Sequence, residues 1–317
     1  MEKKAFNIKE YVSFIILFVT ILFFSVFGKG FLSVSNFLNV FRQQSIICIC
    51  AMGMMMAILT GGIDLSMGSV IGVIGAANAW LMVNTELHPV LTSVICLGIA
   101  ILYGLFNGFV IARLHVPPMV ATLATMTGGR GFCYVITKGI SIYGFNPGYK
   151  ILGQGFLGPV PLPVVFAVIF VLIAYWILTQ TPHGTYLYAL GGNAEAARLC
   201  GIHVEHTLML AYTLNGLFAG IAGLILLARL GSASASLGDG YEMDIITAVV
   251  LGGVSISGGS GKLRGTVCGV LTMGLLSNGL LIMGLSDYYQ MIAKCFVLLT
   301  AVAFYKNFTG SLRRPKK

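Results

Sequence analysis

Long apolar runs follow one another along the whole chain, and they restrict its fold more than any other feature of the sequence. Most of them hold roughly 14 to 23 residues, close to the ~20 residues that cross the hydrocarbon core of a bilayer as a helix. The runs are apolar throughout rather than alternating, which excludes a membrane β-barrel. We therefore predict an all-α fold, a polytopic membrane helical bundle of about ten transmembrane helices. It forms a single transmembrane domain over residues 1–317.

The apolar runs also define the loops. The predicted spans cover residues 11–27, 45–60, 65–83, 91–112, 117–137, 162–180, 207–229, 244–257, 266–285 and 287–304. No small-x-small cleavage site follows the first run, so we interpret it as an uncleaved span rather than a signal peptide. Six crossings precede the sizeable polar segment 181–206, and the outer loops are 138–161 and 230–243.

The positions of Lys and Arg orient this bundle. An even number of spans places both termini on one side, and the positive-inside rule assigns that side to the cytoplasm. The cytoplasmic segments then hold twelve basic residues: Lys3, Lys4, Lys9, Arg113, Arg198, Lys262, Arg264, Lys306, Arg313, Arg314, Lys316 and Lys317. The outer segments hold five: Lys29, Arg42, Lys138, Lys150 and Arg229. The net charge of +9 is therefore explained by membrane orientation, and no nucleic-acid partner is expected.

The polar segment 181–206 contains the pattern of a short helix. The Gly191–Gly192 pair can turn the chain, and Asn193 can cap a helix start. Glu195 suits the positive end of that helix, and Gly201 can close it. This pattern predicts a cytoplasmic helix of about two turns, which is marginal when isolated in water. We therefore expect it to pack against another structure.

Two predicted spans, 45–60 and 244–257, are short and interrupted by glycine. Irregular backbone at membrane depth is tolerated only against protein or a wet cavity, and paired breaks of this kind indicate an internal repeat and a transport pathway. Small-xxx-small patterns would also let helices approach closely, and they occur at Gly68/Gly72, Gly104/Gly108, Gly216/Gly220 and Gly265/Gly269. The candidate residues of the gate or translocation path are Gly61, Gly62, Asp64, Asn107, Gly252, Gly253 and Asn278.

Charged residues in or beside the spans have two interpretations each. Asp64 either lines an inner gate or caps the following helix together with Ser66. Arg130 and Lys294 either snorkel towards the outer surface or take part in pairing or in the pathway. The acids before the eighth span either cap its helix or dock an external partner: Asp239, Glu242 and Asp244.

No motif for catalysis, nucleotide binding or metal binding emerges from the sequence. Gly258–Lys262 resembles part of a phosphate-binding loop, but Ile256 and Leu263 occupy positions where that motif needs Gly and Ser or Thr. The seven cysteines are scattered without a CxxC pair. We therefore expect no catalytic residue, no metal and no cofactor bound by this chain.

Five stretches resemble the permease subunits of ribose-type sugar ABC importers, a branch that includes xylose, arabinose, galactose, galactofuranose and autoinducer-2 permeases. The stretches are Ile58–Ser69, Tyr186–Ile202, Gly240–Asp244, Ala248–Gly259 and Ser277–Gly279. The resemblance runs from about residue 31 to residue 305. Departures from the usual pattern are Ser277, often Asn in that family, Cys200, often Ser, and Thr181–Thr185, where an Arg commonly follows the Gly.

The resemblance implies a bacterial cytoplasmic (inner) membrane protein that forms the path for a monosaccharide. It implies a second permease subunit, identical or different, a cytoplasmic ABC ATPase that uses the ATP, and an extracytoplasmic sugar-binding protein. The ATPase-coupling helix of the family would correspond to Gly192, Asn193, Glu195, Ala196, Ala197, Arg198 and Gly201. The alternative is a secondary transporter or channel that acts alone on a small polar solute, since such proteins also use broken spans. A membrane-embedded enzyme is a third class, suggested only by the isolated Arg130 and Lys294.

Overall fold

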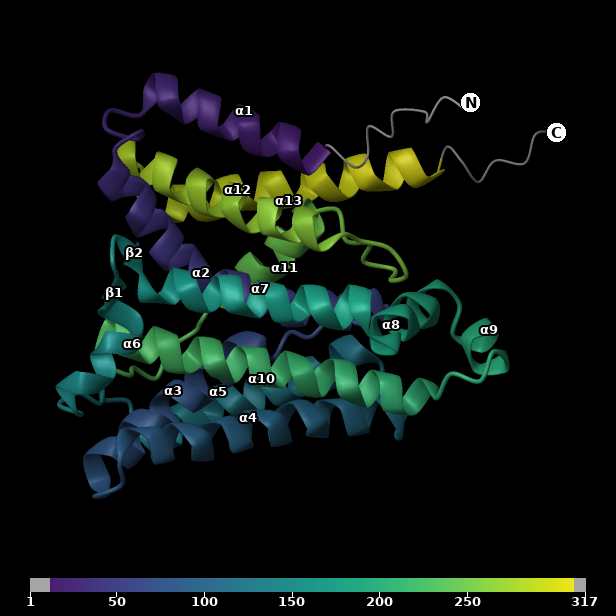
Figure 1. Cartoon of the computed structure of the whole chain (residues 1–317), viewed down its shortest axis with the longest axis horizontal. Coiled ribbons are helices and arrows are strands. Elements are labelled where there is room, and N and C mark those ends of the chain that lie inside the picture. Colours follow the sequence, from purple (N-terminus) through teal and green to yellow (C-terminus); the bar gives the residue numbers. More distant parts are fainter. Residues whose placement is uncertain (1–11, 311–317) are drawn as a thin grey trace.

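A computed structural model describes residues 12–310, and it is a bundle of mostly antiparallel helices with one small hairpin (Figure 1). The elements in order are α1 (Val12–Phe27), α2 (Val34–Leu59), α3 (Met67–Asn84), α4 (Pro89–Ala112), α5 (Pro118–Thr137), η2 (Pro147–Lys150), α6 (Ile151–Gln154), β1 (Phe156–Leu157), β2 (Val160–Pro161), α7 (Leu162–Gln180), α8 (Pro182–Gly192), α9 (Ala194–Leu199), α10 (Val204–Leu230), α11 (Tyr241–Leu251), α12 (Leu263–Ile282) and α13 (Asp287–Gly310). The prediction of a helical polytopic protein is confirmed.

Six helices in the described part of the chain are long and apolar enough to cross a membrane: α2, α3, α4, α7, α10 and α12. Helix α1 is apolar but has 16 residues, and α11 has only 11. The predicted count of about ten spans is therefore not confirmed. The basic residues expected near the termini, Lys3, Lys4, Lys9, Arg313, Arg314, Lys316 and Lys317, lie outside the described residues.

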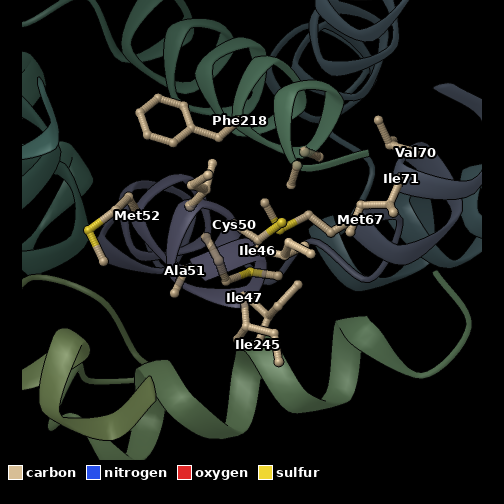
Figure 2. Packing of buried hydrophobic residues seen from close by; sticks show 14 of the residues in the cluster. Ile46, Ile47, Cys50, Ala51, Met52, Met67, Val70, Ile71, Phe218 and Ile245 are labelled. Carbon is tan, nitrogen blue, oxygen red and sulfur yellow. The ribbon is translucent and has the colours of Figure 1, made fainter. Parts of the chain in front are cut away.

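Helix α2 forms the centre of the core. From Gln44 to Leu59 every residue except Cys48 is buried, and α3, α10 and α11 contribute side chains around it (Figure 2). The prediction that this span is short is wrong, because α2 has 26 residues. It begins at Val34, where the hydroxyl of Ser33 accepts a hydrogen bond of 3.3 Å from the backbone nitrogen of Asn36. Such a cap satisfies one of the free N–H groups at a helix start.

Helices α4 and α10 pack backbone against backbone through their glycines. A Cβ atom at Gly104 would lie 2.4 Å from the carbonyl oxygen of Tyr212, and one at Gly216 would lie 2.6 Å from that of Ala100. Both distances are too short for real atoms, so the close approach depends on glycine. The small-xxx-small prediction is confirmed for this helix pair.

The predicted eighth span is a half-length helix followed by irregular chain. Helix α11 is about 16 Å long at ~1.5 Å per residue, roughly half of the ~30 Å hydrocarbon core. After Leu251 the chain continues without helix to Lys262, with positive φ at Gly253, Gly258 and Gly259. The glycine break predicted here is confirmed, and so is the break after α2, where Gly61 has a φ of +87°.

Candidate transport machinery

The short helix predicted in the polar loop is present as α9 and projects from one end of the bundle (Figure 1). The side-chain oxygen of Asn193 accepts hydrogen bonds of 3.0 Å from the backbone nitrogens of Glu195 and Ala196, and Gly201 follows with a φ of +85°. The prediction that Gly191–Gly192 turns the chain is wrong, because both glycines lie in α8. The turn occurs at Asn193, which adopts an extended backbone between the two helices.

Helix α9 is almost fully exposed. Ala197 is its one buried residue, and the side chain of Leu199 is apolar yet 83% exposed. Glu195 and Arg198 lie at the surface with 3.8 Å between their charged groups. An exposed leucine on a short exposed helix leaves apolar surface that a contact with another protein could remove from water. The sequence alone did not single out Leu199.

Three backbone segments meet where α8 ends, and we call their meeting point the glycine junction. It consists of Leu59–Gly61 at the end of α2, Gly191–Gly192 at the end of α8 and Gly258–Gly259 after α11. A Cβ atom at Gly191 would lie 1.9 Å from the carbonyl oxygen of Leu59, and one at Gly258 would lie 2.7 Å from the nitrogen of Gly61. The two predicted breaks therefore contact each other and the polar loop.

A side-chain contact strengthens this connection. The hydroxyl of Tyr188 in α8 donates a hydrogen bond of 2.9 Å to the carbonyl oxygen of Gly261. Helix α8 is thus attached to the chain after α11 at two points. Helix α9 is therefore supported by the bundle through α8.

Asp64 lies in the first break as part of a buried polar group that we call the Asp64 cluster: Asp64, Ser66, Asn107 and Asn215. Asp64 is 2% exposed. One carboxylate oxygen accepts hydrogen bonds from the nitrogen and the hydroxyl of Ser66, at 2.8 and 2.6 Å, and the other accepts one from the amide of Asn215 at 2.8 Å. The amide of Asn107 donates to the Ser66 hydroxyl at 2.9 Å.

The Asp64 cluster connects the break to two other helices, because Asn107 lies in α4 and Asn215 in α10. The hydrogen bonds between Asp64 and Ser66 close a turn just before α3, but Ser66, at the N-cap of that helix, makes no side-chain cap hydrogen bond, so the capping interpretation is not confirmed. Asn215 was missed by sequence reasoning, although an amide in the middle of an apolar span is a signal for a buried polar contact. Gly62 packs beside the cluster, where a Cβ atom would lie 2.2 Å from the hydroxyl of Tyr212.

The remaining candidate path residues lie elsewhere. Asn278 forms a reciprocal amide pair with Asn36 of α2, with distances of 2.9 and 2.8 Å. Gly252 packs against α12, where a Cβ atom would lie 2.5 Å from the carbonyl oxygen of Gly265. Gly253 only supplies the positive φ of the turn. The structure brings Asn107 to Asp64 but does not bring Asn278 there.

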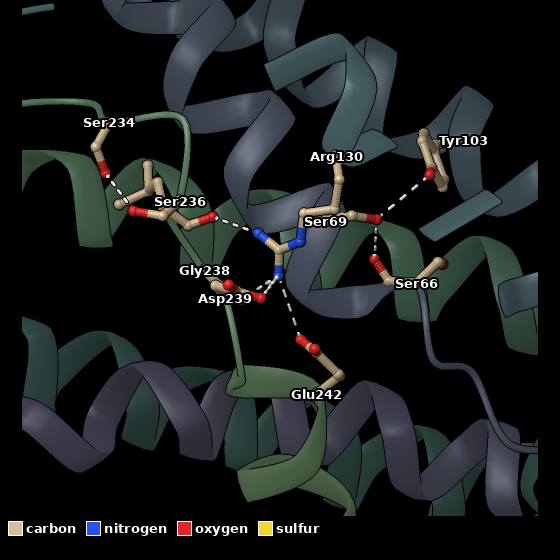
Figure 3. A network of polar contacts seen from close by, with 10 residues as sticks. Ser66, Ser69, Tyr103, Arg130, Ser234, Ser236, Gly238, Asp239 and Glu242 are labelled. Carbon is tan, nitrogen blue, oxygen red and sulfur yellow. Dashed lines mark hydrogen bonds and ion pairs between the residues drawn. The ribbon is translucent and has the colours of Figure 1, made fainter. Parts of the chain in front are cut away.

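Arg130 is the centre of a second polar network, which Figure 3 shows close to Ser66 and Ser69 at the start of α3. Its guanidinium donates hydrogen bonds of 3.0 Å to the carbonyl oxygens of Leu237 and Gly238. It also lies 3.1 Å from the carboxylate of Asp239 and 3.5 Å from that of Glu242. Arg130 therefore pairs rather than snorkels.

Lys294 pairs as well, with 2.8 Å between its ammonium and both carboxylate oxygens of Asp244. Two of the three acids considered for docking are thus engaged inside the protein, since Glu242 is 7% exposed. The side chain of Asp239 is 67% exposed and remains accessible from outside despite its contact with Arg130. Among residues 12–310, no group of three or more His, Cys, Asp or Glu residues could hold a metal ion.

Membrane-length helices, two helix breaks that meet at one junction and an exposed short helix define a multi-pass membrane transport protein. The chain belongs to the family described as the permease component of the branched-chain amino acid transport system, which it matches over residues 36–302.

Known permeases are similar over most of their length. The ribose import permease protein RbsC of Bacillus subtilis is 41% identical over 291 residues, 91% of this chain and 90% of that protein. The Haemophilus influenzae protein of the same name is 42% identical over 306 residues, 95% and 94% of the two chains. The xylose transport system permease protein XylH of Haemophilus influenzae is 30% identical over 94% of this chain and 96% of its own. No solved structure matched the chain.

Proposed function

We propose that this protein is the transmembrane permease subunit of a binding-protein-dependent ABC importer that carries a monosaccharide, a ribose-like pentose or a related sugar. The observation that carries the proposal is the exposed helix α9, joined through α8 to both helix breaks at the glycine junction. The family description names branched-chain amino acids, but the three relatives above are named for ribose and xylose. Because these three relatives align with more than 90% of this chain, they favour a sugar over a branched-chain amino acid as the transported solute.

The proposed assembly has three further components. A second permease subunit completes the path, a cytoplasmic ATPase binds α9 and uses the ATP, and an extracytoplasmic sugar-binding protein docks on the outer side, near Asp239. The protein lies in the bacterial cytoplasmic membrane with both termini inside. Ten crossings are consistent with this arrangement if α11 and the irregular chain after it together make one crossing.

The proposed mechanism uses the glycine junction as a mechanical link. Closure of the ATPase displaces α9, and α8 carries the displacement to the chain after α2 and after α11, because the backbones touch without side chains between them. The gate residues of the proposal are Gly61, Gly62 and Asp64, with Asn107 behind them. The Gly252–Gly253 pair holds the second break against α12, and Asn278 joins the far part of α12 to the start of α2.

A weak sugar site in the permease suits this mechanism. A ligand shifts an equilibrium between two conformations only by its differential affinity for them. A path that bound the sugar tightly in both conformations would not release it. High affinity therefore belongs to the soluble binding protein.

The proposal is tested by uptake into proteoliposomes that contain the permease, its ATPase and its binding protein. We expect ATP-dependent uptake of ribose or xylose and none of leucine, and we expect Glu195→Arg to abolish uptake while membrane insertion is unchanged. Uptake by the permease alone, driven by a proton or sodium gradient, would establish the stand-alone transporter instead. Unchanged uptake in the Glu195→Arg variant would refute the role of α9.

A further inference from the structure

A cavity of about 320 Å³ lies between the first turns of α2 and the β1–β2 hairpin, at the end of the bundle opposite to α9. One face of α2 supplies most of its wall, and the hairpin supplies the remainder. The lining residues are Val34, Ser35, Leu38, Asn39, Arg42, Phe156 and Pro161. Polar and apolar side chains thus share one cavity, which nothing in the transport mechanism uses.

Arg42 brings an unneutralised positive charge to this cavity. Its Nε donates a hydrogen bond of 3.0 Å to the carbonyl oxygen of Gly153, and its guanidinium lies 5.8 Å from the centre of the Phe156 ring. Within residues 12–310 no carboxylate forms an ion pair with Arg42, and the charge that acts on it, Arg229, is also positive. A guanidinium has five N–H donors, so those on its two terminal nitrogens remain for an anion.

The three acids that precede or begin α11 are already engaged with other basic residues. Asp239 and Glu242 contact Arg130, and Asp244 contacts Lys294. The neighbours of Arg42 are a carbonyl group, an aromatic ring and a second arginine. An arginine without a counterion is energetically unfavourable beside a membrane, so a bound anion would stabilise this arrangement. A phosphate is the anion that the planar guanidinium binds best, through two parallel hydrogen bonds.

The position of Arg42 selects a lipid as the source of that phosphate. Residues 43–59 of α2 carry no charge, so Arg42 marks the boundary between the apolar part of this helix and its outer end. Val34 and Phe156 are 76% and 59% exposed, and they flank the cavity with apolar surface. A cavity near the lower end of the usual ~300–1,000 Å³ accommodates a headgroup but not acyl chains, which would extend along the exposed apolar side chains.

We propose that this cavity binds the phosphoglycerol headgroup of an anionic phospholipid, with the phosphate on Arg42 and with Ser35 and Asn39 as hydrogen-bond donors to the headgroup. An arginine with free N–H donors binds a phosphate through charge-assisted, bidentate hydrogen bonds, and this chemistry is the same on either side of a membrane. Phosphatidylcholine carries the same phosphate, but its quaternary ammonium would meet the positive charges of Arg42 and Arg229. The site therefore prefers phosphatidylglycerol.

Native mass spectrometry of the detergent-purified protein tests the proposal. The probes are dioleoyl phosphatidylglycerol, dioleoyl phosphatidylcholine and inorganic phosphate, each added at equal concentration. We expect a retained phosphatidylglycerol adduct that becomes about fivefold weaker in Arg42→Gln. Lys29→Gln removes one exposed positive charge at the same end and should leave the adduct unchanged. Ser35→Trp fills the cavity without touching the charge and should also weaken the adduct, which covers the case in which Arg42→Gln does not fold.

Three results would overturn the proposal. Equal phosphatidylglycerol adducts in wild type, Arg42→Gln and Ser35→Trp would show that the lipid binds elsewhere. Retention of inorganic phosphate as strong as that of the lipid would identify a free anion as the ligand. A lipid-free dimer that dissociates in Arg42→Gln would assign the cavity to a second copy of this chain.

Discussion

The backbone nitrogen of Gly259 donates a hydrogen bond of 3.0 Å to the carbonyl oxygen of Leu59. These residues lie 200 positions apart in the sequence, one at the end of α2 and the other in the irregular chain after α11. The hydrogen bond satisfies a carbonyl that the end of a helix leaves free. It also joins the two breaks directly, at the point where α8 of the polar segment ends. A displacement of α8 therefore acts on both breaks together.

Gly191 should be far less tolerant of substitution than its neighbour Gly192. A Cβ atom at Gly191 would lie 1.9 Å from the carbonyl oxygen of Leu59, whereas one at Gly192 would meet nothing within 4 Å. Overpacking of this kind costs about 1–3 kcal/mol, and backbone cannot yield as a side chain can. We expect Gly191→Ala to lower the melting temperature and to reduce ATP-dependent uptake. Gly192→Ala should leave both near wild type. Equal behaviour of the two variants would contradict the packing at the glycine junction.

Much of the fold follows from the sequence because its main signals are local. Apolar runs of membrane length predict helices from their own residues, and α3, α4, α7 and α10 begin and end near the predicted positions. The cap at Asn193 is equally local, since the side chain binds nitrogens two and three residues further along. The start of α2 was misplaced, because the polar residues Asn36, Asn39 and Arg42 interrupt its hydrophobic pattern without interrupting the helix.

Pairings across the bundle could not be predicted in the same way. Arg130 and Glu242 are 112 residues apart, and only the fold brings them together. Asn278 and Asn107 were both candidate path residues, yet Asn278 pairs with Asn36 and Asn107 joins the Asp64 cluster. Such contacts depend on how helices rotate about their axes, and one sequence does not reveal that rotation.

Leu199 should contribute directly to binding of the ATPase. Its side chain is 83% exposed on α9, and burial of a leucine is worth about 1.5–3 kcal/mol. We expect Leu199→Asp to weaken capture of the ATPase by the solubilised permease by about tenfold or more. The adjacent Cys200 is also exposed, and Cys200→Ser should leave capture unchanged. Undiminished capture by Leu199→Asp would show that the ATPase binds elsewhere.

The contact between Asp64 and Asn215 should be energetically coupled. The Asn215 amide donates at 2.8 Å to a buried carboxylate, and loss of a donor to a buried charge costs about 1–3 kcal/mol or more. Asn215→Leu should therefore lower the unfolding free energy more in the wild-type protein than in the Asp64→Asn variant. A double-mutant cycle measures this difference from the unfolding free energies of the four detergent-solubilised proteins.

A matched control for this cycle exists in α3. The amide of Asn78 is also buried and donates at 2.9 Å, but to the hydroxyl of Tyr149. Asn78→Leu and Asp64→Asn should therefore be additive within about 0.5 kcal/mol. A coupling for Asn215 no larger than that for Asn78 would mean that the Asn215 hydrogen bond contributes nothing specific to Asp64.

The pair of Lys294 and Asp244 should stabilise the contact between α13 and α11. Both side chains are about three-quarters buried, and 2.8 Å separates the ammonium from each carboxylate oxygen. Removal of one partner from such a pair leaves a poorly solvated charge, so Lys294→Met and Asp244→Asn should each lower the unfolding free energy by about 1–3 kcal/mol. Asp239→Asn, at an exposed side chain, should change it by less than about 1 kcal/mol.

The double variant Asp244→Lys with Lys294→Asp exchanges the two charges. It distinguishes the contribution of the ion pair from the contribution of the partial positive charge at the start of α11. Asp244 lies in the first turn of α11, where the partial positive charge of the helix start favours an acid and disfavours a lysine. The exchange restores the ion pair but reverses this interaction. We therefore expect only partial recovery, with an unfolding free energy between those of the single variants and the wild type. If Lys294 merely snorkelled, Lys294→Met would be neutral or stabilising and the exchange would be worse than either single variant.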